Sequence, residues 1–366
     1  MSPNSPFDTP VVVILFSRPH RIRELVGVLR EIRPARILAI ADGPRATHPT
    51  DPEACSLARA ALDGIDWPCS IEREFAEANL GCDHRIVSGL DWAFSRVDRA
   101  IVLEDDILPH PSFLPWAAAM LDRFGTDPSV GIISGRNPLG SWGDATQDHI
   151  RAPYGSIWGW AATARAWRHI QACDLAGDPS NAEADLRRSG LDPLLQAHWT
   201  VALQMFRRGE LTAWDVLFSL RAGMLGLLSV HSPVNLTRNT GIGPEATRTL
   251  YEDDFSALLR AREARALQTP ATVHPPDPAF ANAALTVHLL ARCRNPTMAA
   301  RLARMIQRGT PVPLDAGTRH HLTPFLHVVE SLGLLEHLAG QGMTSPTFDS
   351  LLRAMRHLAA SNQPNP

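Results

Sequence analysis

The chain has 366 residues, which is enough for two domains or for one large domain with an appendage. Hydrophobic residues make up 45% and charged residues 20%, so a large core is available, and the net charge of -3 argues against a broad nucleic-acid surface. Lysine is absent, and all 35 basic residues are arginine. Schiff-base chemistry and a lysine-bearing phosphate loop are therefore excluded. A bound anion must be held by arginine, histidine, backbone N–H groups or a metal.

The cysteines and the apolar segments indicate where the protein works. Five cysteines are scattered without a CxxC pair, which argues against a disulfide framework or a structural zinc site. The N-terminal residues lack the charged-then-apolar pattern of a signal peptide, and no apolar run is long enough to span a membrane. We therefore expect a soluble cytoplasmic protein without a membrane span.

The first 44 residues predict a βαβ unit. Residues 11–16 form a continuous apolar run rich in β-branched side chains, which is typical of a parallel strand buried on both faces. Apolar residues over 22–32 fall on one helical face. Residues 36–41 form a second strand that ends at an Asp-Gly-Pro turn. Such a unit predicts an α/β domain.

Strands and helices continue to alternate as far as residue 134, and the composition then changes. From about residue 141 the chain is rich in aromatic residues and glycine, and after Phe255 it is almost wholly helical. We place an α/β domain at 1–259 and a helical domain at 260–366. Further strands are predicted at Ser70–Phe75, Arg99–Leu103, Val130–Ser134 and Leu227–Leu236. Helices are predicted at Glu53–Leu62, Cys82–Phe94, Pro111–Phe124, Leu194–Phe206, Val216–Leu220, Phe255–Ala266, Pro278–Arg292, Met298–Arg308, His320–Ala339 and Phe348–Ala359.

An acidic cluster follows the predicted strand at 99–103. Glu104, Asp105 and Asp106 are adjacent, and in an open α/β sheet ligands bind at the carboxyl ends of strands. Three carboxylates repel one another unless a cation or solvent relieves them. Mg²⁺ or Mn²⁺ accepts one or two carboxylates together with substrate phosphates. The cluster therefore predicts a metal-assisted nucleotide diphosphate site, and a solvated acidic turn is the alternative.

Several short segments, in their order and spacing, resemble the nucleotide-binding half of GT-A glycosyltransferases. The similarity is greatest to bacterial family-2-like transferases, often labelled hemolytic-protein-like, which are related to the N-acetylglucosaminyltransferase I type with its Glu-Asp-Asp motif. The resemblance covers roughly residues 10–250. The segments are Val11–Pro19, Asp42-Gly43, Asn79-Leu80-Gly81 ahead of a helix, Val102–Asp106, Trp158-Gly159-Trp160-Ala161, Trp214-Asp215 and Asn235–Thr249.

The resemblance implies a GT-A fold, a Rossmann-like and mainly parallel sheet flanked by helices, with a helical C-terminal appendage. It also implies inverting, metal-assisted transfer of a sugar from a nucleotide-sugar, with UDP favoured, to a hydroxyl of a glycan or small-molecule acceptor. The implied roles are the following: Arg18 near the nucleotide, Asp42 on the base, Arg85 near the diphosphate or base, Asp105 at the ribose or sugar, Asp106 on the metal, and Trp158, Gly159 and Trp160 under the donor sugar. Glu104 is counted with the donor-binding residues, and a plain core position is the alternative for each tryptophan.

Asp215 is the candidate catalytic base that the resemblance implies. Inverting transfer needs a carboxylate that takes the proton of the acceptor hydroxyl through an oxocarbenium-like transition state. Asp215 also precedes a predicted helix, where aspartate is a favoured N-cap. The two roles are compatible only if the carboxylate also reaches the cleft.

The chain departs from the family in two segments and leaves other functions open. Phe218 replaces a tryptophan, and Arg248 replaces a histidine with a side chain that pairs with phosphate but cannot bind metal. A non-catalytic scaffold or glycan-binding subunit is therefore an alternative. A sugar nucleotidyltransferase is a further one, although residues 17–20 do not form its glycine-rich phosphate loop. The C-terminal helices could dock an acceptor, a partner or a second subunit.

Overall fold

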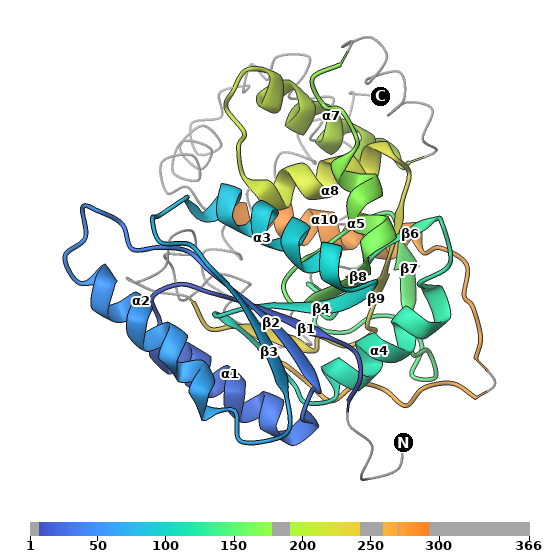
Figure 1. The fold of residues 1–366 in the computed structure, drawn as a ribbon. Helices are drawn as coiled ribbons and strands as arrows, with labels where there is room; N and C mark the ends of the chain where they lie inside the picture. The colour runs from blue at the N-terminus through green and yellow to red at the C-terminus, as the bar shows by residue number, and fades with distance from the viewer. Residues whose placement is uncertain (1–6, 178–190, 242–258, 270, 293–366) are drawn as a thin grey trace, which may run out of the picture.

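A computed structural model describes residues 7–177, 191–241, 259–269 and 271–292. These residues form an eight-stranded mixed sheet with helices on both faces (Figure 1). The strand order is β3-β2-β1-β4-β8-β6-β9-β7, and β5 pairs with β10 in a separate small sheet. The strands are β1 (Val11–Leu15), β2 (Arg36–Ala41), β3 (Ser70–Phe75), β4 (Arg99–Glu104), β5 (Ile107–Pro109), β6 (Val130–Ser134), β7 (Ile150–Ala152), β8 (Trp160–Thr163), β9 (Leu228–His231) and β10 (Thr237–Asn239). The helices are α1 (Pro19–Ile32), α2 (Asp51–Ala60) with the 3-10 turn η1 (Ala61–Gly64), α3 (Cys82–Arg96), α4 (Phe113–Phe124), α5 (Ala164–Gln171), α7 (Pro193–Arg207), α8 (Trp214–Met224) and α10 (Pro278–Arg292).

The predicted α/β class is confirmed. Strands β1 to β4 pair in parallel. Helices α1, α2 and α3 lie between successive strands and carry the chain back to the end of the sheet at which each strand begins. The predicted bounds of β2, β3, β6 and α10 match the structure residue for residue. The antiparallel β8 lies between β4 and β6, so the sheet is mixed beyond β4.

The two faces of the sheet explain the apolar run in β1. Val11, Val13 and Leu15 point into a core shared with α1 and α4, whereas Val12 and Ile14 point into one shared with α3, α5 and α8. A strand covered on both sides needs apolar side chains at every position. Figure 1 shows the two helical layers on opposite sides of the sheet.

Several predicted elements differ from the structure in their end residues, and two are wrong over longer stretches. The strand predicted over Leu227–Leu236 ends at His231, because Ser232 and Pro233 leave the ladder and Pro cannot donate to it. The helix predicted over Phe255–Ala266 is wrong at residues 259–266, which carry no helix, and its first four residues lie outside the described part.

Residues 259–269 and 271–277 instead form an extended strap along the α/β unit. Backbone N–H groups of the strap bond to distant acceptors: Arg262 N to Asn235 O (2.8 Å), Ala264 N to Ser112 Oγ (2.8 Å) and Gln268 N to Asp148 Oδ2 (2.7 Å). A helix over these residues would withdraw those donors, so long-range hydrogen bonds replace the local ones.

The strap leads into α10, which is packed against the same unit. Buried residues of α10, among them Phe280 and Leu285, share a core with α7 and β7. This helix is therefore packed on the α/β unit, and the boundary expected after residue 259 stays a prediction. The helices predicted beyond Arg292 lie outside the described residues. Within the described part of the chain, no helix has the length and apolar character needed to cross a bilayer.

Candidate functional site

The sheet has a switch point between β1 and β4. After β1 the chain builds β2 and β3 on one side, and α3 then carries it to β4 on the other side. In open α/β sheets, ligands bind in the crevice outside the carboxyl ends of the two strands at such a point. Arg18 follows the end of β1 and Asp105 directly follows the end of β4. The fold therefore brings opposite charges to this crevice.

Arg18 bridges the two aspartates of the acidic cluster. Its Nη1 donates to Asp105 Oδ1 (3.1 Å) and to Asp106 Oδ2 (3.0 Å), and Phe16 N donates to Asp105 Oδ2 (3.3 Å). The pKa of Asp105 is raised to about 6, mainly by burial and also by the neighbouring Asp106, against the lowering effect of Arg18. The half-buried Glu104 ends β4 beside them. Three of the predicted site residues thus meet in one charged group.

The chain that follows β10 passes over this acidic pair. Thr240 N donates to Asp106 O (2.7 Å), and Arg21 Nη2 donates to Thr240 O (2.7 Å). Gly241 lies so close that an added Cβ would meet the Asp106 carboxylate. Glycine is needed there for the backbone to approach. The segment leads on to Arg248, which lies outside the described residues.

Asp106 fits the donor set of a hard divalent cation. Among the described residues no group of three or more His, Cys, Asp or Glu side chains is placed to hold a metal. Mg²⁺ does not need such a group, because it usually binds one or two carboxylates together with waters and substrate phosphates. Asp106 Oδ2 is used by Arg18, but its Oδ1 accepts no hydrogen bond from the described part of the chain. That oxygen is a suitable ligand.

Asp42 has a different task from the expected base contact. Its carboxylate, 6% exposed, accepts hydrogen bonds from the N–H groups of Gly43, Leu80 and Gly81 and from Asn79 Nδ2, at 2.8–3.0 Å. A carboxylate has about four acceptor positions. Asp42 therefore holds residues 79–81 at the start of α3, and the prediction that it reads a base is not supported.

Arg85 is buried beside the ends of β2 and β3. It is 4% exposed and donates to Ala41 O (3.1 Å) and to Glu74 O, which ties α3 to the ends of β2 and β3. Burial lowers the pKa of its guanidinium, and Glu74 and Asp42 raise it. The structure therefore corrects the role expected near the diphosphate, since both contacts are structural.

The Trp-Gly-Trp segment divides between the site and the core. Because β8 is antiparallel to β4, with Trp160 opposite Val102, the residues just before β8 lie near the carboxyl end of β4. Gly159 has φ 70 and its added Cβ would meet Thr237. Trp160 is 1% exposed and packs on Trp167 and Phe218. The expected place under a donor sugar is therefore wrong for Trp160, whereas Trp158 remains at the surface of a pocket.

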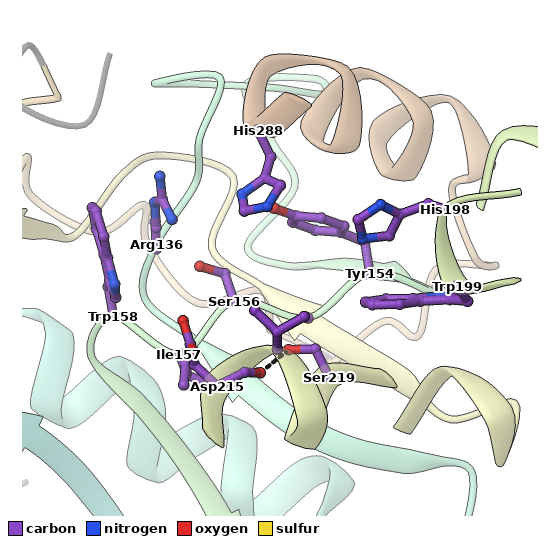
Figure 2. Close-up of a pocket in the computed structure, with 12 residues that line it drawn as sticks. Arg136, Tyr154, Ser156, Ile157, Trp158, His198, Trp199, Asp215, Ser219 and His288 are labelled. Atoms are coloured by element: carbon purple, nitrogen blue, oxygen red, sulfur yellow. Dashed lines mark hydrogen bonds between the residues drawn. The ribbon is translucent and has the colours of Figure 1, made fainter. Parts of the chain in front are cut away.

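Trp158, which precedes β8 near the carboxyl end of β4, lines this pocket (Figure 2). The pocket is a small hollow that is partly open to solvent. The Arg136 guanidinium lies over the Trp158 ring, 3.9 Å from its centroid. The lining residues come from the loop after β6, from the loop before β8 and from α7, α8 and α10: Arg136, Tyr154, Gly155, Ser156, Ile157, Trp158, His198, Trp199, Asp215, Val216, Ser219 and His288.

Asp215 lines the pocket from the first turn of α8. The helix begins at Trp214 with Ala213 as its N-cap, so the alternative that Asp215 is an N-cap is wrong. Asp83 on α3 supplies the capping acceptor instead, because its Oδ1 receives the Trp214 N–H (3.0 Å). The positive end of the helix dipole favours a carboxylate at this position. Asp215 thus lies beside the pocket, and its role as a base stays a prediction.

His231 supports the pocket from behind. The side chain is fully buried, with Nε2 2.6 Å from Tyr154 O and Nδ1 3.2 Å from Arg136 O. Burial lowers the pKa of His231, although both carbonyls raise it. The ring therefore joins the backbones of Arg136 and Tyr154, two residues on the pocket wall.

A second buried histidine belongs to a charged cluster that fixes the strap. Asp148, fully buried, accepts two hydrogen bonds from Arg123 (3.1 Å each), one from His149 Nδ1 (2.7 Å) and one from Gln268 N (2.7 Å). Burial would raise the pKa of Asp148, but these hydrogen bonds outweigh it and leave the pKa lowered. His149 Nε2 faces the His274 N–H at 3.5 Å.

The stability of the protein is expected to fall when the pH drops below about 6.5. Burial lowers the pKa of His149, against the raising effect of Asp148, while Arg123 and His274 also lower it. As the pH falls, His149 is therefore protonated in the unfolded chain before it is protonated in the folded protein. Stability is lost as the pH falls from about 6.5 toward the folded-state pKa. The slope reaches about 1.4 kcal/mol per pH unit for one such group, and His231 adds to it.

Urea denaturation of wild type and His149→Gln between pH 7.5 and 5 measures this slope. The variant should show a flatter dependence, because its amide does not titrate but can still donate to Asp148. His48→Gln, at an exposed position, is the control and should keep the wild-type slope. Equal slopes in all three proteins would contradict the assignment.

Several pocket residues were not predicted from the sequence. Arg136 follows the end of β6 by two residues, the same signal that marked Asp42 and Asp105, and could have been found by it. His198 and His288 lie on α7 and α10, and nothing in their local sequence distinguishes them from other helical histidines.

The comparisons with known proteins add no family. Neither the protein-family models nor the curated proteins contain a match to the chain. The structure itself defines an α/β protein with a mixed, mostly parallel sheet that is compatible with a Rossmann-like fold. It carries a charged group at the switch point, and a pocket that Trp158 lines.

Proposed function

We propose that the chain is a glycosyltransferase of the GT-A type that transfers a sugar from a nucleotide-sugar, with UDP favoured, to a hydroxyl acceptor. One observation carries the proposal: Arg18, Asp105 and Asp106 meet in the crevice between the carboxyl ends of β1 and β4. This is where an open α/β sheet receives a nucleotide. A guanidinium suits phosphate oxygens, and a carboxylate suits the cation that accompanies them.

The donor half of the site is assigned to the crevice. Asp106 would hold Mn²⁺ or Mg²⁺, and the bound metal would neutralise the diphosphate leaving group. Arg18 would pair with phosphate oxygens, and Asp105, with Glu104 beside it, would accept hydrogen bonds from ribose or sugar hydroxyls. Asp42 and Arg85 would contribute indirectly, by fixing the loop at residues 79–81 and the ends of β2 and β3.

The acceptor half is assigned to the pocket of Figure 2. Tyr154 and Trp158 line it, and aromatic side chains suit the C–H surface of a sugar. Ser156 and Ser219 offer hydroxyls, and Asp215 would take the proton from the attacking hydroxyl, which fits an inverting transfer. Trp158 lines this pocket. Its neighbour Gly159 lies next to Ile107, which follows Asp106 in the sequence. A donor sugar in the crevice would therefore lie toward the acceptor.

Calorimetric binding of UDP and GDP with and without Mn²⁺ tests the proposal. Wild type should bind one nucleotide, more tightly with Mn²⁺. Asp106→Ala should weaken that binding by at least about tenfold, because it removes a metal ligand, and should abolish the Mn²⁺ effect. Asp63→Ala removes an aspartate that is 74% exposed and should behave as wild type. A folded wild-type protein that binds neither nucleotide would contradict the proposal and favour a non-catalytic scaffold.

A further inference from the structure

A single nitrogen of Arg18 serves both carboxylates of the acidic pair. Nη1 is 3.1 Å from Asp105 Oδ1 and 3.0 Å from Asp106 Oδ2, and all three side chains are less than a quarter exposed. Adjacent carboxylates in such a poorly solvated place repel one another strongly. The Arg18 guanidinium lies between the two carboxylates and supplies a positive charge that reduces their repulsion.

We propose that Arg18 is an internal counter-ion that competes with the divalent cation and leaves the acidic pair when a nucleotide diphosphate binds. The inference rests on the proposed function and deepens it. With Arg18 between the carboxylates, a divalent cation meets both a fixed positive charge and an acidic pair that is already neutralised in part, so it binds weakly. Phosphate oxygens offer Arg18 a bidentate partner of matching geometry. Nucleotide and metal therefore bind cooperatively, because each favours the state in which Arg18 has moved.

The local backbone suits such a movement. Arg18 O accepts from Arg21 N (3.1 Å) and Ile22 N (3.3 Å), so the main chain is fixed at the start of α1. The side chain can change its rotamer without disturbing that helix. The nearby Arg21 donates instead to Thr240 O, so Arg18 is the cation that contacts the carboxylates among the described residues. One side chain can thus couple the two binding events.

Mn²⁺ affinity of wild type and Arg18→Met, measured by calorimetry with and without UDP, tests the coupling. Without UDP, the variant should bind Mn²⁺ roughly five- to a hundredfold more tightly than wild type, the usual range of coupling between ligands. UDP should tighten Mn²⁺ binding to wild type by a similar factor, and this gain should shrink in the variant. Mn²⁺ should also raise the melting temperature of the variant more than that of wild type.

Arg23→Met is the matched control. It removes a positive charge from an exposed position of the same helix and should leave Mn²⁺ affinity unchanged. If Arg18→Met does not fold, Arg18→Gln replaces it in the same measurement. Mn²⁺ affinity no higher in the Arg18 variant than in wild type would overturn the counter-ion inference, while UDP binding could still support the transferase. If no form binds UDP, the proposed function fails, and the metal titrations still decide whether Arg18 competes.

Discussion

Replacement of Asp215 by asparagine is expected to lower turnover by about 10²- to 10⁴-fold, the usual contribution of a positioned general base. Asparagine keeps the shape of the side chain in the first turn of α8 but cannot take the acceptor proton. Nucleotide binding should change little, because Arg18 and Asp106 come from the ends of β1 and β4. Release of the nucleoside diphosphate in the presence of acceptor measures turnover, and calorimetry measures nucleotide affinity.

The pattern of the two measurements separates a chemical role from a structural one. A purely structural Asp215 would lower the melting temperature along with activity, whereas loss of its contact with the helix dipole alone should cost only about 0.3–1 kcal/mol. Asp63→Asn, at an exposed position, serves as the control and should retain full turnover. Wild-type turnover in Asp215→Asn would remove Asp215 from the mechanism.

The second large effect is expected from Asp148→Ala, which should lower the free energy of unfolding by about 3–5 kcal/mol. The substitution leaves Arg123 and His149 without their carboxylate and removes the acceptor of the Gln268 N–H. A buried charge that loses its partner costs more than the pair contributes. The melting temperature should fall on the order of 10 °C, measured by calorimetry or circular dichroism.

The exposed pair Arg99–Asp122 provides the comparison. Asp122 is 65% exposed, so Asp122→Ala should change the free energy of unfolding by less than about 1 kcal/mol. The loss in free energy of unfolding for Asp148→Asn should lie between those of Asp148→Ala and Asp122→Ala, because the amide keeps an acceptor oxygen for Gln268 N. A loss in Asp148→Ala as small as that in Asp122→Ala would mean that the cluster does not hold the strap.

Local pattern was sufficient for the framework of the sheet. The continuous apolar runs of β1, β2 and β6 and the helical spacing of α1 and α3 predict their elements, because a strand or helix covered by other layers must present apolar side chains to them. The short strands β5, β7, β8 and β10, with three or four residues each, were not predicted. Such segments are too short to show a period.

The sequence by itself also determined that the acidic residues 104–106 come at the end of a strand, and it indicated the α/β class. Only the tertiary structure decided which polar side chains face the crevice. Asp42 and Asp105 carry the same local signal, yet Asp42 is used by N–H groups about 40 residues away whereas Asp105 meets Arg18. Trp158 and Trp160 stand two residues apart, and one lines the pocket while the other is core. The physical reason is that hydrogen bonds and packing join residues distant along the chain, and local spacing does not record them.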